Sequence, residues 1–218
     1  EDTRDWKISY AISDLKNNKG QFIKIACRPF DIRDTYYTGK TKGFYSYPRN
    51  EIMSNFVNKA NIGLVVSKQA SQGFKHVYLT NTICNLNLTG TAGKFGAGYT
   101  FPLYFYPEIN GQQTIEQITE RKPNLNIEIV TQIAKKLGLT YTNEKEETDN
   151  TFAPIDILDY IYAVLHSPTY REKYKEFLKI DFPRVPYPKD TETFWQLVKL
   201  GGDPEEHTSE LQSRGHLV

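Results

Sequence analysis

The stretch "APIDILDYIYAVLHSPTYREKYKEFLK", residues 153–179, decides how the second half of the chain folds. Its first part is a strongly apolar run of helical length, which predicts a buried helix. Ser167 is a good helix N-cap and Pro168 suits the first position of a helix, so a second helix should begin there. One face of this second helix would carry Tyr170, Tyr174 and Phe177. We expect this face to pack in the same core as the first helix.

Helical periodicity is present on both sides of this stretch. The segment before it has a polar cap at Asn124 or Asn126, and Gly138 stands where a helix would stop. Its apolar stripe consists of Ile127, Val130, Ile133, Ala134 and Leu137. After a proline-rich extended connector, a last helix is expected over residues 191–202. The second half of the chain should therefore be helical.

The first half has a different pattern. Between Gly20 and Pro107, short segments rich in β-branched and aromatic residues are bounded by Gly, Asn and Pro, which is typical of strands. These segments cover residues 21–30, 62–68, 76–81 and 99–107. A short amphipathic helix is expected over 5–17 and another helix over about 48–60. The first of these helices would carry Ile8, Ile12 and Leu15 on one side.

Together these patterns predict an α+β fold, with a mostly β region over 1–107 followed by a helical region over 108–202. We expect residues 108–123 to be a linker or an excursion. Residues 203–218 are set apart, because 205–213 match the conceptual translation of a common sequencing adapter without a mismatch. The expectation is that this tail is an artefact and that the chain is a fragment truncated at both ends.

Composition and charge narrow the function. Apolar residues make up 39% of the chain and aromatic residues 13%, which is ample for a packed core and excludes a disordered protein. The formal net charge is only +1, but it is unevenly distributed. Residues 20–105 hold ten bases and three acids, a net charge of +7, whereas residues 111–202 hold twelve bases and fourteen acids, a net charge of −2. The basic half is therefore expected to face a polyanion.

The chain has no apolar window long enough to span a bilayer, and no signal peptide opens it. Its two cysteines, Cys27 and Cys84, lack any metal-ligand spacing. We interpret them as reduced, buried thiols and expect a cytoplasmic protein without membrane contact.

Residues 28–49, "RPFDIRDTYYTGKTKGFYSYPR", carry the main functional signal. The cations of this segment are Arg28, Arg33, Lys40, Lys42 and Arg49, and they are interleaved with aromatic residues. Lys and Arg neutralise phosphates, and the arginine fork also matches the acceptors of guanine in the major groove. The alternative is structural, with aromatic residues in the core and cations on the wet face of a strand.

No catalytic site is visible in the sequence. "GTAGKFGAG" (90–98) fails the spacing of a phosphate-binding loop, and "FGAGY" (95–99) runs into a strand-like segment where a cofactor motif would open a helix. His76 and His166 have no nucleophile or metal partner spaced near them. The Asn/Asp-Pro-Pro-aromatic tetrapeptide that holds a flipped base in amino-methyltransferases is absent as well. We expect no catalytic residue, bound metal or cofactor in this fragment.

Several longer motifs are specific enough to indicate a family. They are "CRPFDIRDTYY" (27–37), "PRNEIM" (48–53), "NIGLVVSKQ" (61–69), "HVYLTNTI" (76–83), "YTFPLYFYP" (99–107) and "DILDYIYAVLHSPTYREKYKEFLKIDFPRVP" (156–186). Together they resemble the C-terminal specificity domain of type ISP restriction–modification enzymes and related regions of large adenine-specific DNA methyltransferases. One departure is Cys27, where Tyr is usual.

The resemblance implies a module that recognises double-stranded DNA over 1–107. It would direct an N6-adenine methyltransferase, and in some members a nuclease and a helicase, that lie upstream in the same polypeptide. S-adenosylmethionine, with Mg and ATP where cleavage or translocation occurs, would be bound by those upstream parts. The alternative function is a non-catalytic docking or scaffold domain of a larger enzyme.

The expected DNA-facing residues are Arg28, Arg33, Lys40, Lys42, Arg49, Lys68 and Gln69. The two loop lysines should contact phosphates, and Arg49 or Gln69 should meet a base edge. For Arg28 and Arg33, an ion pair with Asp31 or Asp34 that braces the fold is equally compatible with the sequence.

Overall fold

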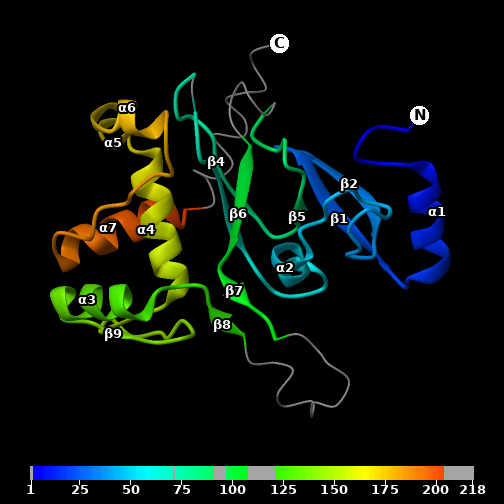
Figure 1. The fold of residues 1–218 in the computed structure, drawn as a ribbon. Coiled ribbons are helices and arrows are strands. Elements are labelled where there is room, and N and C mark those ends of the chain that lie inside the picture. Colours follow the sequence, from blue (N-terminus) through cyan, green and yellow to red (C-terminus); the bar gives the residue numbers. More distant parts are fainter. Residues whose placement is uncertain (1, 71, 91–96, 108–120, 204–218) are drawn as a thin grey trace.

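The computed structural model describes residues 2–70, 72–90, 97–107 and 121–203, and the predictions that fall on the other residues lie outside it. Figure 1 shows a β-rich part that contains the N-terminal half and a group of helices built from the C-terminal half. The predicted α+β fold, with strands first and helices after them, is confirmed.

The first sheet has the strand order β2-β1-β5. β1 (Gln21–Arg28) and β2 (Asp31–Tyr37) form an antiparallel hairpin, and β5 (Ile83–Cys84) pairs in parallel with β1. The hairpin turns at Phe30, whose φ of 71° is unusual for a residue with a side chain. The inner face of the hairpin packs on α2 (Asn50–Met53) through the hydrophobic cluster around Ile25 and Tyr37.

The second sheet has the order β4-β3-β6 and lies at the centre of the molecule (Figure 1). It consists of β3 (Gly63–Ser67), β4 (Val77–Thr80) and β6 (Gly98–Pro102). β6 is an edge strand, which explains how Pro102 is accommodated in it. β7 (Tyr104–Phe105) pairs with β8 (Lys122–Pro123), so the last two residues of the segment predicted as a linker or an excursion are held in a strand. Residues 108–120 of that segment lie outside the described residues.

The helical half begins with α3 (Ile127–Leu137), and a pair of short strands, β9 (Thr140–Tyr141) and β10 (Thr151–Phe152), follows it. The remaining helices are α4 (Pro154–His166), α5 (Pro168–Lys173), α6 (Lys175–Leu178) and α7 (Thr191–Gly201). The caps explain these bounds. The Asn126 side chain accepts hydrogen bonds from two backbone amides of α3, Gly138 ends that helix with a φ of 66°, and Ser167 separates α4 from α5 as predicted.

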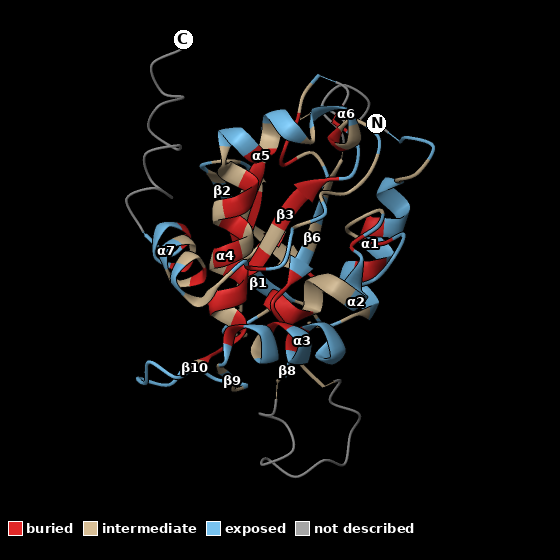
Figure 2. Cartoon of the chain, turned by 90° about the vertical axis from the view of Figure 1, so that its left-hand side faces the viewer, coloured by how far each residue is buried: buried red, intermediate tan, exposed pale blue. Residues whose placement is uncertain are grey.

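The main hydrophobic cluster joins the central sheet to the helices. Val66 and Val77 contribute from the sheet, while Phe152, Leu165 and Phe194 contribute from the helical half. In Figure 2 the buried colour is concentrated on β3 and α4, which face each other in this cluster. The boundary predicted at 107/108 stays a prediction about domain organisation, and the hydrophobic packing is continuous across it.

The predicted helix after Ser167 is wrong in one respect, because it is divided at Tyr174. This residue has a φ of −105° and a ψ of 15°, which ends α5 and shifts the phase of α6. As a result Leu178 is fully buried, whereas Phe177 is only half-buried and lies under the Arg184 guanidinium. Tyr170 is buried as expected.

Two further expectations are corrected, and one is confirmed. The helix expected over about 48–60 is limited to α2 and a following 3-10 turn, η1 (Ser54–Phe56). Ile127, placed in the apolar stripe of α3, is 64% exposed because it stands in the first turn, outside the face that contacts the core. The helix expected over 5–17 is α1 (Ile8–Asn17), and its apolar stripe faces solvent.

Candidate nucleic-acid interface

All seven residues predicted to face DNA have exposed side chains. The structure distributes them over three places: the β1–β2 hairpin, the loop between β2 and α2, and the C-terminal end of β3. Exposure makes contact with DNA sterically possible at each place, and the partners of each cation distinguish their roles.

On the hairpin, Arg33 forms a two-pronged ion pair with Asp31. Its Nε and Nη2 donate to the two carboxylate oxygens at 2.8 and 2.7 Å, and these bonds lower the pKa of Asp31. Arg28 donates from Nη1 to its neighbour's carbonyl, Cys27 O, at 2.7 Å. The bracing interaction that the sequence left open is therefore present at Arg33, and contact of Arg28 and Arg33 with DNA stays a prediction.

The loop after β2 is anchored by the buried carboxylate of Asp14 on α1. Thr38 Oγ1 and Phe44 N donate to Asp14 Oδ2 at 2.7 and 2.8 Å. Burial alone would raise the pKa of Asp14, but these bonds and one from Asn18 outweigh it, so the pKa is lowered. The negative charge thus holds the loop in one shape.

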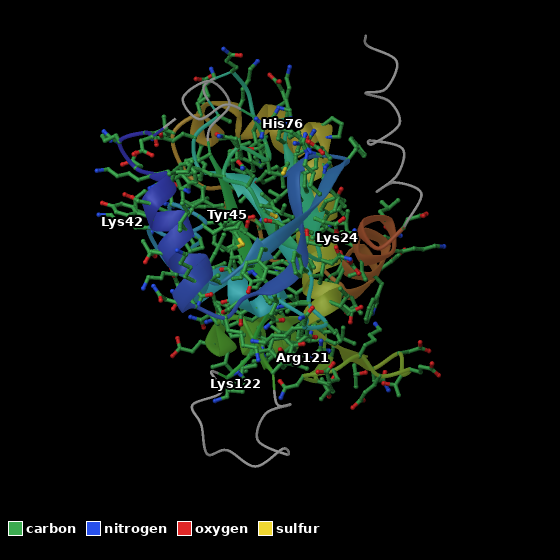
Figure 3. The ribbon with its side chains drawn as sticks, turned by 90° about the vertical axis from the view of Figure 1, so that its right-hand side faces the viewer. Lys24, Lys42, Tyr45, His76, Arg121 and Lys122 are labelled. Atoms are coloured by element: carbon green, nitrogen blue, oxygen red, sulfur yellow. The ribbon has the colours of Figure 1, made fainter. Side chains whose placement is uncertain are left out.

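The two lysines of this anchored loop are on the surface, and their charges act on nearby acids: Lys40 on Asp14 and Lys42 on Asp5. Lys40 and Lys42 are exposed, and neither is within ion-pair distance of another described residue. Lys42 has a φ of 54°, so the loop is tightly turned at this point. In Figure 3 Lys42 lies at the left edge, at mid-height beside α1, whereas His76 lies near the top and Arg121 and Lys122 lie near the lower end.

Arg49 stands directly before α2 with a φ of 51°, a conformation that is uncommon for a residue with a side chain. It lines an open cavity of about 550 Å³ together with Tyr47, Leu86 and Tyr99. Among the described residues, no acid is within ion-pair distance of the guanidinium of Arg49. Its donors are therefore available to a ligand.

Lys68 lies next to β6, and residues of this strand also line the Arg49 cavity. Ser67 pairs with Gly98 at the start of β6, so Lys68 follows directly at this edge. The Lys68 Nζ is 5.7 Å from the ring centroid of Phe182, which in turn contacts the ring of Tyr99 at 5.1 Å. Gln69 is the next residue and is also exposed.

The structure places Arg49 and Lys68 in different surroundings. Arg49 lines the open cavity with Tyr99, whereas Lys68 lies over Phe182, which contacts the Tyr99 ring, and Gln69 follows Lys68 in the chain. Arg28 lines a different cavity, of about 350 Å³, with Tyr78 and Leu88.

Sequence reasoning missed Tyr99 and Phe182 as neighbours of the cations. Tyr99 could have been found from the alternation of aromatic residues in "YTF", residues 99–101. Phe182 lies in the connector between α6 and α7, where no local sequence pattern predicts its contact with Lys68.

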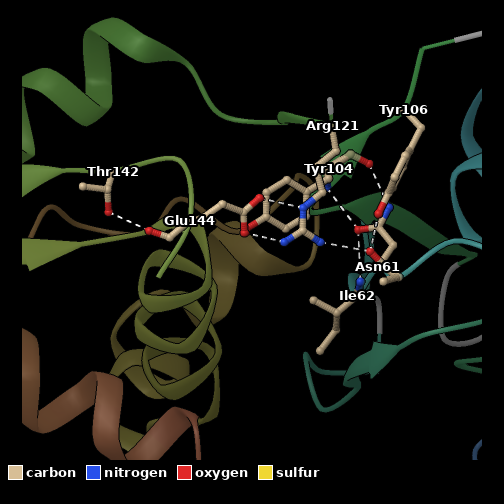
Figure 4. A network of polar contacts seen from close by, with 8 residues as sticks. Asn61, Ile62, Tyr104, Tyr106, Arg121, Thr142 and Glu144 are labelled. Atoms are coloured by element: carbon tan, nitrogen blue, oxygen red, sulfur yellow. Dashed lines mark hydrogen bonds and ion pairs between the residues drawn. The ribbon is translucent and has the colours of Figure 1, made fainter. Parts of the chain in front are cut away.

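Arg121 has a structural role at the other end of the molecule (Figure 4). Its guanidinium lies 3.8 Å from the ring centroid of Tyr104, pairs through two nitrogens with Glu144 and donates from Nη1 to Ala60 O at 3.1 Å. The pair with Arg121 lowers the pKa of Glu144. This cation therefore ties the strands to the loop after β9, and its donors are occupied by the protein itself.

No group of three or more His, Cys, Asp or Glu side chains in the described part of the chain could hold a metal ion. Cys27 and Cys84 form no disulfide, and both are half-buried, so the expectation that they are buried is wrong. Within the same residues, no helix has both the length and the apolar character needed to cross a membrane.

The model of one protein family, the Type ISP C-terminal specificity domain, matches residues 1–203 of the chain. The chain belongs to this family. No protein of curated function matches the chain. The specificity domain has a fold similar to part of a DrdV–DNA complex solved by cryo-electron microscopy, with a TM-score of 0.60 and 23% identity over 83% of this chain and 14% of that one.

A second similar structure is the ATP-dependent Type ISP restriction–modification enzyme LlaBIII bound to DNA. Its TM-score is 0.61, with 19% identity over 90% of this chain and 12% of that one. At these identities the likeness concerns the fold. The specificity domain spans only 12–14% of either longer chain.

Proposed function

We propose that this specificity domain recognises a sequence in double-stranded DNA on behalf of a restriction–modification enzyme. The family match over residues 1–203 carries the proposal. The exposed cations around Tyr99 and on the anchored loop supply the chemistry, because they offer donors to phosphates and to base edges.

The two groups of cations would have different roles. Lys40 and Lys42 stand on an exposed loop and would neutralise phosphates, which gives affinity without sequence preference. Arg49 lines the open cavity with Tyr99, and Gln69 is exposed just after the end of β3, so these two side chains would contact bases. Lys68 lies over the Phe182 ring and would contact the sugar–phosphate backbone of the DNA beside these bases.

The rest of the enzyme would supply the chemistry. An N6-adenine methyltransferase module of the same polypeptide would bind S-adenosylmethionine and modify the sequence that this domain selects. Nuclease or helicase parts, where present, would use Mg and ATP. Such an enzyme acts on DNA in the cytoplasm, and unpaired thiols at Cys27 and Cys84 are compatible with that compartment.

The alternative, a docking or scaffold domain without DNA contact, is favoured by one observation. Arg33 and Lys24 are occupied by Asp31 and Asp34, so part of the positive charge of the hairpin serves the fold. The salt dependence of duplex binding separates the two functions, because only phosphate neutralisation releases counterions.

The test is to change Lys40 and Lys42 to Ala together and measure duplex binding against salt concentration. We expect weaker binding to every sequence and a slope of log K against log salt that is shallower by about two. The matched control is the pair Lys135 and Lys136, two adjacent exposed lysines on α3, whose replacement should leave the slope unchanged. Equal effects of the two double variants would contradict the proposed interface.

A further inference from the structure

α1 presents an apolar stripe to solvent. Ile8, Ile12 and Leu15 fall on one side of this helix, and they are 55%, 49% and 45% exposed. A surface helix of a globular protein normally turns its apolar stripe toward the core. Three large aliphatic side chains in a contiguous stripe therefore require another explanation.

The side of α1 that contacts the body is held largely by hydrogen bonds. Ala11 and Asp14 are its buried residues, and the Asp14 carboxylate accepts hydrogen bonds from Thr38 and Phe44. Just before the helix, the Trp6 indole donates to Phe44 O at 3.0 Å. These bonds fix the rotation of α1 about its axis, so the stripe cannot turn inward without breaking them.

The position of α1 suggests what covers the stripe. The helix lies at one edge of the molecule, on the far side from α3 to α7 (Figure 1), and the chain enters the fold through it. The family is described as a C-terminal domain, and this chain spans 12–14% of the similar longer chains. In such an enzyme most of the polypeptide precedes this domain and reaches it at α1.

The charge around the stripe adds a second requirement. Lys7, Lys16 and Lys19 are exposed along the helix and its ends. Of the acids in this region, Asp14 is buried, Asp5 pairs with Arg4, and Asp2 accepts a hydrogen bond from Ile8 N. A surface that covers the stripe would match it best with an apolar centre and an acidic rim.

We propose that the α1 stripe is the docking surface for the part of the same polypeptide that precedes residue 1, through an apolar patch bordered by acidic side chains. Because the two parts are covalently joined, a modest apolar contact is enough to hold them, since the local concentration of the partner surface is high. The proposal is independent of which residues contact DNA.

Cysteine labelling tests this contact. Ile12→Cys is prepared in the 218-residue chain and in the intact enzyme polypeptide, and the reaction of the α1 peptide with a maleimide is followed by mass spectrometry. We expect the reaction in the intact enzyme to be slower by about ten-fold or more, because the partner surface shields the thiol. Ser13→Cys is the matched control, since Ser13 is exposed on another side of α1 and should react at similar rates in both proteins.

Equal rates for Ile12→Cys in the two proteins would overturn the proposal. Protection that occurs in the 218-residue chain alone and grows with its concentration would also overturn it, in favour of a second copy as the occupant. Neither outcome depends on duplex binding, so failure here is distinguishable from failure of the proposed DNA recognition.

Discussion

At the scale of single residues, Asp159 on α4 is the carboxyl group with the most unusual titration. Burial and then the nearby charge of Asp156 raise its pKa to about 7 from a usual value of 3.8, although Lys145 opposes the shift. At a pH between these two pKa values, the Asp159 carboxyl is ionised in the unfolded chain but still protonated in the folded chain. The free energy of unfolding therefore falls as the pH rises through this window. Above about pH 7 the full cost of the ionised carboxylate is present.

We therefore predict that Asp159→Asn stabilises the protein at pH 8 and does so much less at pH 4. The gain at pH 8 should be about 1–2 kcal/mol, reduced from the full shift because the carboxyl is partly exposed. Denaturant unfolding at the two pH values measures the difference. Asp149→Asn in the exposed loop is the control, and a gain for Asp159→Asn that does not vary with pH would contradict the assignment.

Two neighbouring residues of α6 should differ strongly in their contribution to stability. Leu178 is fully buried in the main cluster, so Leu178→Ala should cost about 2–5 kcal/mol. Phe177→Ala should cost less, because that ring is half-buried and contacts the Arg184 guanidinium. Equilibrium unfolding of both variants compares them directly. A larger loss for Phe177→Ala would mean that α6 is rotated relative to this structure.

At the scale of elements, α4 and α7 approach each other closely at Gly201. A Cβ placed on this residue would lie 1.9 Å from the backbone oxygen of Asp159, and a backbone atom cannot rotate away as a side chain can. Gly201→Ala should force the helices apart and cost about 1–3 kcal/mol. Leu200→Ala, at the adjacent and half-exposed position, should cost less than about 0.5 kcal/mol. Thermal unfolding that gives equal losses would contradict this packing.

Local signals were enough to predict some elements. Asn126 and Gly138 bound α3 as expected, and Ser167 with Pro168 separates α4 from α5, because caps act through the few backbone groups next to them. The end of α5 was missed, since Tyr174 carries no helix-breaking signal in the sequence. The exposure of the apolar stripe of α1 could not be predicted, because periodicity identifies an apolar face but not the surface that covers it.

At the scale of the whole molecule, the candidate interface was only partly predictable. The richness of residues 28–49 in cations is a property of the sequence, and the pairing of Arg33 with Asp31 follows from two residues on one face of a strand. The contact between Lys68 and Phe182 could not be predicted, because it depends on how the connector after α6 passes the end of the central sheet.

The same long-range packing explains how the two halves act as one body. The central sheet contributes Val66 and Val77 to the cluster formed by the helices, and Arg121 joins β8 to Glu144. Phe182, from the connector in the helical half, contacts both Lys68 and Tyr99, so the helical half supports the end of the central sheet that carries Lys68. We expect the helices to be required for the shape of the interface even though they lie outside the basic region.

Selection of bound sequences from a pool of random DNA duplexes tests DNA recognition most directly. The 218-residue chain should enrich one sequence at physiological salt, and Arg49→Ala should lose the preference at one or two base pairs of it, a change of about 1–3 kcal/mol on that sequence alone. The Lys40 and Lys42 double variant should enrich the same sequence with lower affinity. Failure of the parent chain to enrich any sequence, or identical enrichment by the parent and Arg49→Ala, would contradict the assignment of Arg49 to base recognition.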